Sequence, residues 1–183
     1  MTSTPSQNER RQVESDIIEG QPYQCRTRPD HEHKDLLLVY DYWKSKCDEH
    51  GRQPTLSEIE LMDLWQIAHN MIIVDLVEGI KRPNRFRFRY FGTNVRLRSR
   101  VEMTDRFIDD IFPEEALPEA HKIYSTVLST GIPNIWKRKI DFIEKPDEHS
   151  LEKQHEYSYT RLLVPLLNKN QIPAHLLGVF HMR

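Results

Sequence analysis

One short segment, RFRFRYFG at residues 85–92, constrains the fold more than any other feature of the sequence. It alternates arginine with aromatic residues, and in a β-strand successive side chains point to opposite faces of the sheet. The segment is therefore predicted to be a strand with a buried aromatic face and a solvated basic face. The expected buried residues are Phe86, Phe88 and Tyr90, and the expected exposed residues are Arg85, Arg87 and Arg89. An antiparallel sheet commonly has one face covered by the core and one face exposed to solvent.

Further strand patterns flank this segment. MIIVDLVE (71–78) is a short β-branched run, and GIKRPN (79–84) has turn chemistry, so residues 71–91 are predicted to form a β-hairpin. The final third contains three long strand patterns that predict an antiparallel meander, with a polar insert between the first and second. These patterns are NIWKRKIDFIE (134–144), YSYTRLLVPLL (157–167) and IPAHLLGVFHM (172–182).

Helical spacing appears before and between the strands. Apolar residues recur at intervals of three or four from Leu36 to Cys47, and Gly51 is a suitable stop. Thr55 and Glu58 form a capping-box pattern that opens a second helix, expected to end between Trp65 and Asn70. Residues 93–100 and 105–113 predict short helical pieces, and residues 114–131 predict the longest helix of the second half.

The totals fit one domain and a tail. The chain has 183 residues, a formal net charge of −2 and no apolar run near the roughly 20 residues that cross a bilayer. Residues 1–33 are polar and predicted to be a flexible tail, in which residues 8–19 form either a short docked helix or part of a disordered segment; residues 34–183 form the domain. We expect a cytoplasmic protein with two free thiols, Cys25 and Cys47.

Basic residues are concentrated around the alternating segment. Eight lysines and arginines and no acidic residue lie between Gly79 and Val101. Such a bias favours contact with an acidic surface, a nucleotide or an acidic segment of the same chain. Nucleic acid is disfavoured, because the aromatic residues that would stack on bases point away from the arginines.

The order of these elements, two strands, several helices and three strands, resembles the PAS fold. Five blocks in succession are similar to a group of small bacterial PAS-like domain proteins: YWKSKCDEHGRQPTLSEIE, MIIVDLVE, RFRFRYFGTNV, MTDRFIDDIF and YTRLLVPLL with LLGVF. The resemblance implies an α+β fold, with a five-stranded antiparallel sheet, helices on one face and an N-terminal helical extension. Where the group has Thr-Gly-Arg, this chain has Asp105 between Thr104 and Arg106. Aspartate visits the left-handed backbone region more often than most residues, so the turn is expected to survive.

The resemblance also implies a pocket between the sheet and its helices. From the facing of the residues and the place of PAS pockets we expect a wall of Phe86, Phe88, Tyr90, Val95, Phe107, Ile111, Tyr124, Trp136 and Leu163. The surface of Arg85, Arg87 and Arg89 is expected to meet a protein partner or a second copy in a homodimer. Because the sequence ends at Arg183, directly after the last predicted strand, output is expected to pass through such an interface.

The leading hypothesis is a regulatory PAS-like module that binds an unidentified small molecule, a regulatory protein or both. The alternative is a ligand-free scaffold whose core is filled by its own side chains, and a small-molecule enzyme is a remote third. No catalytic motif is present, and six glycines without a glycine-rich loop disfavour a nucleotide-binding enzyme. No motif supports haem or flavin, although His69, His121 and His175 lie near apolar residues, and no third ligand completes a metal site with His31 and His33. All three tryptophans, Trp43, Trp65 and Trp136, are expected to be buried.

Overall fold

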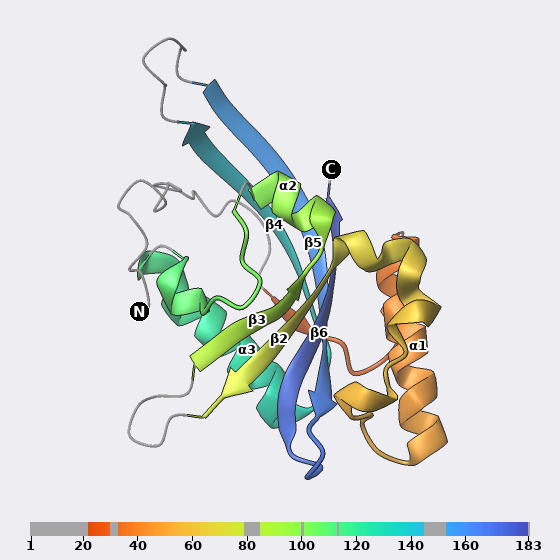
Figure 1. Ribbon diagram of the computed structural model, residues 1–183. Coiled ribbons are helices and arrows are strands. Elements are labelled where there is room, and N and C mark those ends of the chain that lie inside the picture. Colours follow the sequence, from red (N-terminus) through yellow and green to blue (C-terminus); the bar gives the residue numbers. More distant parts are fainter. Residues whose placement is uncertain are drawn as a thin grey trace.

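The computed structural model describes residues 22–29, 33–78, 85–99, 101–112, 114–144 and 153–182. Its centre is an antiparallel sheet in the order β1-β4-β5-β6-β2-β3 (Figure 1). The predicted hairpin is confirmed as β2 (Met71–Val77) and β3 (Arg85–Phe91), although its turn at 79–84 lies outside the described residues. The predicted meander is confirmed as β4 (Asn134–Glu144), β5 (Lys153–Leu167) and β6 (Pro173–Met182).

The strand order brings segments that are distant in sequence together in the sheet. β2 pairs with β6, so the first hairpin and the last strand meet in the middle of the sheet although they are far apart in sequence. The five long strands thus form the antiparallel sheet of a PAS-like α+β fold, as expected. A sixth strand, β1 (Tyr23–Gln24), pairs with the edge of β4. This part of the predicted tail is anchored, and Cys25 after it is buried; residues 1–21, including the possible helix at 8–19, lie outside the described residues.

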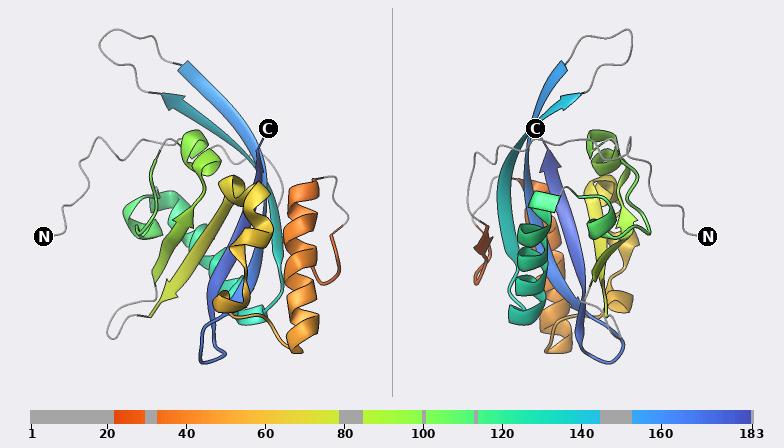
Figure 2. Two further views of the ribbon diagram at one scale, coloured as in Figure 1. Left: turned by 45° about the vertical axis from the view of Figure 1, so that its right-hand side comes forward. Right: turned by 90° about the vertical axis from the view of Figure 1, so that its left-hand side faces the viewer.

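Helices cover both faces of the sheet (Figure 2). One face carries α1 (Lys34–His50), the N-terminal extension, with the 3₁₀ segments η1 (Leu56–Glu58) and η2 (Leu61–Asn70). The other face carries α2 (Thr93–Ser99), η3 (Ile108–Asp110), η4 (Glu114–Ala116) and α3 (Leu117–Thr130). Each face has its own group of buried apolar residues, named here the α1-side cluster and the α3-side cluster. No helix in the described part of the chain has the length and apolar content of a membrane span.

Coverage of both faces explains the apolar runs in the central strands. In β2, Met71 and Ile73 belong to the α1-side cluster, whereas Ile72 and Val74 belong to the α3-side cluster. Alternate residues of β5 divide in the same way, with Leu162 on one face and Leu163 on the other. Such strands lose the apolar–polar alternation, because no face remains for water.

The N-terminal helices follow the sequence signals in part. Gly51 ends α1 in the left-handed conformation (φ 65°), and the Trp43 indole N–H donates to the Pro165 carbonyl oxygen at 2.8 Å, which fixes α1 on β5. The capping box is present, with the Thr55 N–H donating to the Glu58 carboxylate at 2.7 Å. However, two 3₁₀ segments replace the single predicted helix. The prediction that Trp65 is buried is wrong, since it is 63% exposed.

A β-bulge in β3 corrects the predicted facing of its aromatic residues. Ile73 pairs with Tyr90 and Val74 pairs with Phe88, so Arg89 is an extra residue in the strand. A bulge places two successive side chains on the same face. Phe86 and Phe88 therefore point into the α3-side cluster as predicted, whereas Tyr90 packs on the α1 side and donates its hydroxyl to the Ala68 carbonyl oxygen at 3.0 Å.

The outer edge of β3 is covered by the segment around Asp105, where the sequences that this chain resembles have glycine. The Asp105 N–H donates to the Phe88 carbonyl oxygen at 2.7 Å, and the Phe88 N–H donates to the Arg106 carbonyl oxygen at 3.0 Å. Asp105 has φ 61°, in the left-handed region, so the turn survives with aspartate in place of glycine. This short pairing satisfies backbone groups that an edge strand would otherwise expose.

Candidate functional site

Two arginines on the face of the sheet that meets α3 break the apolar character of the α3-side cluster. Arg161 of β5 lies directly opposite Trp136 of β4, and Arg138 lies opposite Tyr159. Arg161 is 5% exposed and Arg138 is 9% exposed. Arginine is rarely buried to this extent without a partner, so these two residues mark the polar part of the cluster.

Both guanidinium groups contact aromatic rings. The Arg138 guanidinium carbon lies 4.6 Å from the centroid of Trp136, and that of Arg161 lies 5.3 Å from the same centroid. Arg161 also lies 5.4 Å from the ring of Tyr124 and 6.0 Å from that of Phe180. Cation–π attraction to these rings offsets part of the cost of removing the charges from water.

Hydrogen bonding leaves one edge of Arg161 without a partner. Its Nη1 donates to the Tyr124 hydroxyl at 3.4 Å, whereas Nε and Nη2 have no partner among the described residues. Arg138 has an unpartnered Nε, and its Nη2 lies 3.9 Å from the Glu119 carboxylate. Guanidinium groups stay protonated in proteins, so Arg161 holds a buried positive charge that no acidic side chain of the described residues neutralises.

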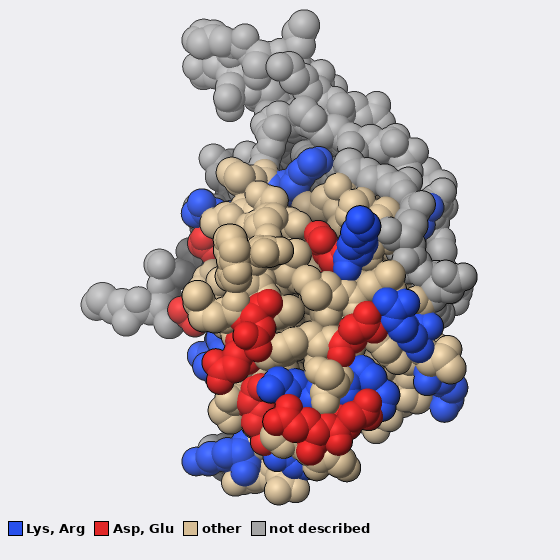
Figure 3. Space-filling model, turned by 90° about the vertical axis from the view of Figure 1, so that its right-hand side faces the viewer, with Lys and Arg blue, Asp and Glu red and all other residues tan. Residues whose placement is uncertain are grey.

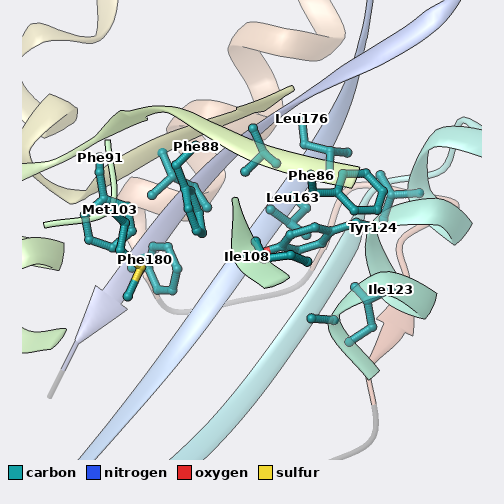
Figure 4. Close-up of a cluster of buried hydrophobic side chains, with 14 of the residues drawn as sticks. Phe86, Phe88, Phe91, Met103, Ile108, Ile123, Tyr124, Leu163, Leu176 and Phe180 are labelled. Carbon is teal, nitrogen blue, oxygen red and sulfur yellow. The ribbon is translucent and has the colours of Figure 1, made fainter. Parts of the chain in front are cut away.

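Tyr124 links the helix to this charge. It extends from α3 into the α3-side cluster, where its ring meets that of Phe86 edge to face at 5.2 Å (Figure 4). Burial raises the pKa of the Tyr124 hydroxyl, and the nearby charge of Arg161 offsets this only in part. The hydroxyl therefore stays protonated and can donate one hydrogen bond while it accepts another from Arg161.

The predicted pocket residues mostly meet in one place. Six of the nine belong to the α3-side cluster, namely Phe86, Phe88, Val95, Tyr124, Trp136 and Leu163, and Ile111 packs against it. Tyr90 lies on the opposite face because of the bulge. Phe107 packs under the guanidinium of Arg85, whose carbon lies 3.9 Å from its ring centroid.

The buried arginines were missed by the sequence analysis, although the sequence contained a signal for them. In NIWKRKIDF, Arg138 has the same parity as Trp136, and in YSYTRLLVPLL, Arg161 has the same parity as Tyr159 and Leu163. A charged residue on the apolar side of a strand pattern indicates a buried charge.

The predicted surface of Arg85, Arg87 and Arg89 contacts acidic residues of the same chain. Arg87 and Arg89 lie 3.2 and 2.9 Å from the carboxylate of Asp75, and Arg85 lies 3.3 Å from Asp109 and 2.7 Å from Asp110. Of the interpretations that the charge bias allowed, the structure shows contact with acidic segments of this chain.

Asp75 is the centre of this ionic group. Its side chain is 4% exposed, and His175 Nδ1 lies 2.8 Å from its Oδ1. Burial raises the pKa of Asp75, but hydrogen bonds from His175, Arg89 and Arg87 outweigh burial and bring the pKa well below the usual value. Asp75 is therefore a charged residue that stabilises the β3–β2–β6 edge of the sheet.

The other candidate residues have structural surroundings. His121 lies 3.0 Å from Asp109, His33 stacks on His181, and His69 is exposed. Among the described residues no three metal-ligating side chains gather, and His31 lies outside them. The cysteines are free as expected, and burial raises the pKa of both thiols to about 11.

Comparisons with known proteins add little to this site. No protein-family model matches the chain, and no curated protein matches it. One similar solved structure is that of an RNA-binding light-oxygen-voltage receptor, with a TM-score of 0.44 and 12% identity. The similarity covers 89% of this chain and 38% of the receptor chain, so this chain spans less than half of the receptor's length. Both the TM-score and the identity are low.

Proposed function

We propose that this protein is a regulatory or sensory PAS-like module that binds a small molecule on the α3 side of its sheet and passes the signal to a protein partner. The fold supports this role, because a PAS-like sheet and its helices enclose the side chains of the α3-side cluster. We also propose that the protein is cytoplasmic and bacterial and belongs to the group of small PAS-like domain proteins. A ligand that binds one surface state more tightly than another shifts the population between them.

The observation that carries the proposal is the convergence of polar groups within an apolar cluster. Arg161, Arg138 and the Tyr124 hydroxyl all lie among buried aromatic residues. Small-molecule sites combine an apolar lining with a few placed polar groups. A core filled only by its own side chains gains nothing from burying a charge that lacks a counter-charge among the described residues, so this feature favours ligand binding over the scaffold.

A candidate output surface lies on the α1 side. The exposed large apolar residues there are Leu38 (44%), Leu61 (41%), Met62 (76%) and Trp65 (63%), on α1 and η2. Tyr42 joins these two elements, accepting from the Glu60 N–H at 2.9 Å and donating to Asp63 at 3.1 Å. Figure 3 shows this side, where charged residues gather towards the end of α1 and a larger uncharged area lies above them. Exposed apolar patches mark interaction sites, so we assign dimer or partner contact to this surface.

Native mass spectrometry, with an absorbance spectrum of protein purified from its own host, tests the proposal. It reports a bound small molecule, a coloured cofactor and the oligomeric state together. A stoichiometric bound mass is the expected result. An empty, colourless protein would favour the scaffold, and catalytic turnover of a bound molecule would favour the enzyme.

A further inference from the structure

We propose that Arg161 is the receptor for a carboxylate, and that the ligand of this module is a small organic acid with an apolar body. This inference rests on the proposed function and adds the chemical class of the ligand, the residue that recognises it and the atoms that hold it.

The two unpartnered nitrogens of Arg161 lie on the same edge of the guanidinium group. Nη1 is engaged by Tyr124, which leaves Nε and Nη2 as a fork of parallel N–H groups. The two oxygens of a carboxylate match such a fork, and the bidentate pair is short and strong. Tyr124 supports it, because accepting from Nη1 fixes the plane of the guanidinium.

The balance of charge around Arg161 also favours an anion. The described residues place no carboxylate within ion-pair distance of Arg161, and Glu119 approaches only Arg138. A buried ionised group without a counter-charge is strongly unfavourable, and arginine cannot become neutral to avoid this. A bound carboxylate would supply the missing counter-charge to the Arg161 guanidinium, and this gain would favour binding.

The side chains around Arg161 determine which ligand body is favoured. Trp136, Tyr124 and Phe180 present rings to the Arg161 guanidinium, and Leu163 lies in the same cluster. These groups offer apolar contact and no acidic repulsion. A ligand with one carboxylate and an aromatic or aliphatic body is therefore favoured over a multiply charged or wholly polar anion.

Thermal unfolding of the full chain provides the test. The probes are benzoate, phenylacetate and hexanoate, each matched with its neutral amide, at constant pH and ionic strength. Inorganic phosphate and sulfate are added as separate arms. We expect a saturable rise in Tm with at least one acid and none with its amide. Absence of a shift with every acid overturns the proposal, and so does an equal rise with phosphate or sulfate, which would mark an unselective anion effect.

Variants of Arg161 show whether this residue causes the rise in Tm with the acids. Arg161→Lys keeps the charge but lacks the fork, so acid affinity should fall roughly 10- to 100-fold, as expected when hydrogen bonds to a charged group are lost. Arg161→Met removes the uncompensated charge, so the Tm of the free protein should rise while the response to acid disappears. The matched control, Arg87→Gln, removes an arginine on the other side of the sheet and should leave the response to acid unchanged. Unchanged acid affinity in Arg161→Lys overturns the assignment.

Failure of this inference can be told apart from failure of the proposed function. A neutral molecule in the native mass spectrum, with no response to acids, would remove the carboxylate receptor and keep the sensory module. An empty protein with no response to acids would remove both.

Discussion

Replacement of Asp75 by asparagine tests whether the buried carboxylate holds the edge of the sheet together. Its side chain is 4% exposed and has three hydrogen-bonding neighbours from two strands, His175 at 2.8 Å, Arg89 at 2.9 Å and Arg87 at 3.2 Å. Asparagine keeps the size of the side chain and removes the charge. The three neighbours then lose a shared anion.

The magnitude follows from how exposed these neighbours are. Breaking a buried ion pair by removing one member costs about 3–5 kcal/mol. The Arg87 and Arg89 side chains are 38% and 49% exposed, so water replaces part of what they lose. Asp75→Asn is therefore expected to lower the free energy of unfolding by about 3 kcal/mol, at the low end of that range.

The effect of pH has a definite sign. Asp75 has a depressed folded pKa, so its stabilisation is present above the ordinary aspartate pKa of about 4 and is lost as the pH falls below that value towards the folded pKa. The asparagine variant lacks this contribution at every pH. The stability difference between the native chain and the variant should thus be constant from pH 6 down to about 4 and shrink below it.

Urea unfolding followed by circular dichroism over this pH range measures the difference. The control is Asp41→Asn, which breaks the exposed pair with Arg28, at side-chain exposures of 49% and 56%, and should cost less than about 1 kcal/mol. A loss for Asp75→Asn no larger than the control, or one that does not change with pH, would refute the reasoning.

Three further changes test other features. Gly92→Ala should cost about 1–3 kcal/mol in chemical unfolding, because its added Cβ would lie 2.4 Å from the His69 carbonyl oxygen; an unchanged midpoint would show that the backbone yields. Asp105 has φ 61°, so Asp105→Ala should lower the free energy of unfolding by about 1 kcal/mol, whereas Asp105→Gly should not lower it; equal stability of all three proteins would contradict a strained turn. The proposed contact through α1 and η2 predicts that Trp65→Ser weakens self-association in analytical ultracentrifugation with little change in Tm, since Trp65 is 63% exposed; unaltered association would remove η2 from the proposed interface.

The elements themselves could be predicted from the sequence, because their signals are local. The apolar spacing from Leu36 to Cys47 and the stop at Gly51 define α1, and the structure confirms both. The alternation of Phe86 and Phe88 with arginine gave the correct strand and the correct buried face. Asp105 also keeps the left-handed turn that its position in the pattern required.

The predictions that failed concerned features that depend on contacts between distant segments. Tyr90 changed face because pairing with Ile73 places a bulge at Arg89, and a period-two pattern contains no information about a partner strand. Trp65 is exposed because its helix became two 3₁₀ segments, which turns different side chains towards the sheet. The pairing of Arg87 and Arg89 with Asp75 likewise required β2 and β3 to lie in register.

In the candidate site, too, some features could be predicted from the sequence and others could not. Most of the aromatic and aliphatic lining could be predicted from the sequence, because an apolar face repeats at the period of its strand or helix, but Tyr90 and Phe107 lie outside the α3-side cluster. The packing of β4, β5 and α3 against one another placed Arg161 beside Trp136 and Tyr124, with one edge of its guanidinium group unpaired among the described residues. The physical reason is that a side chain's facing depends on its own strand, whereas its charge balance depends on every segment packed around it.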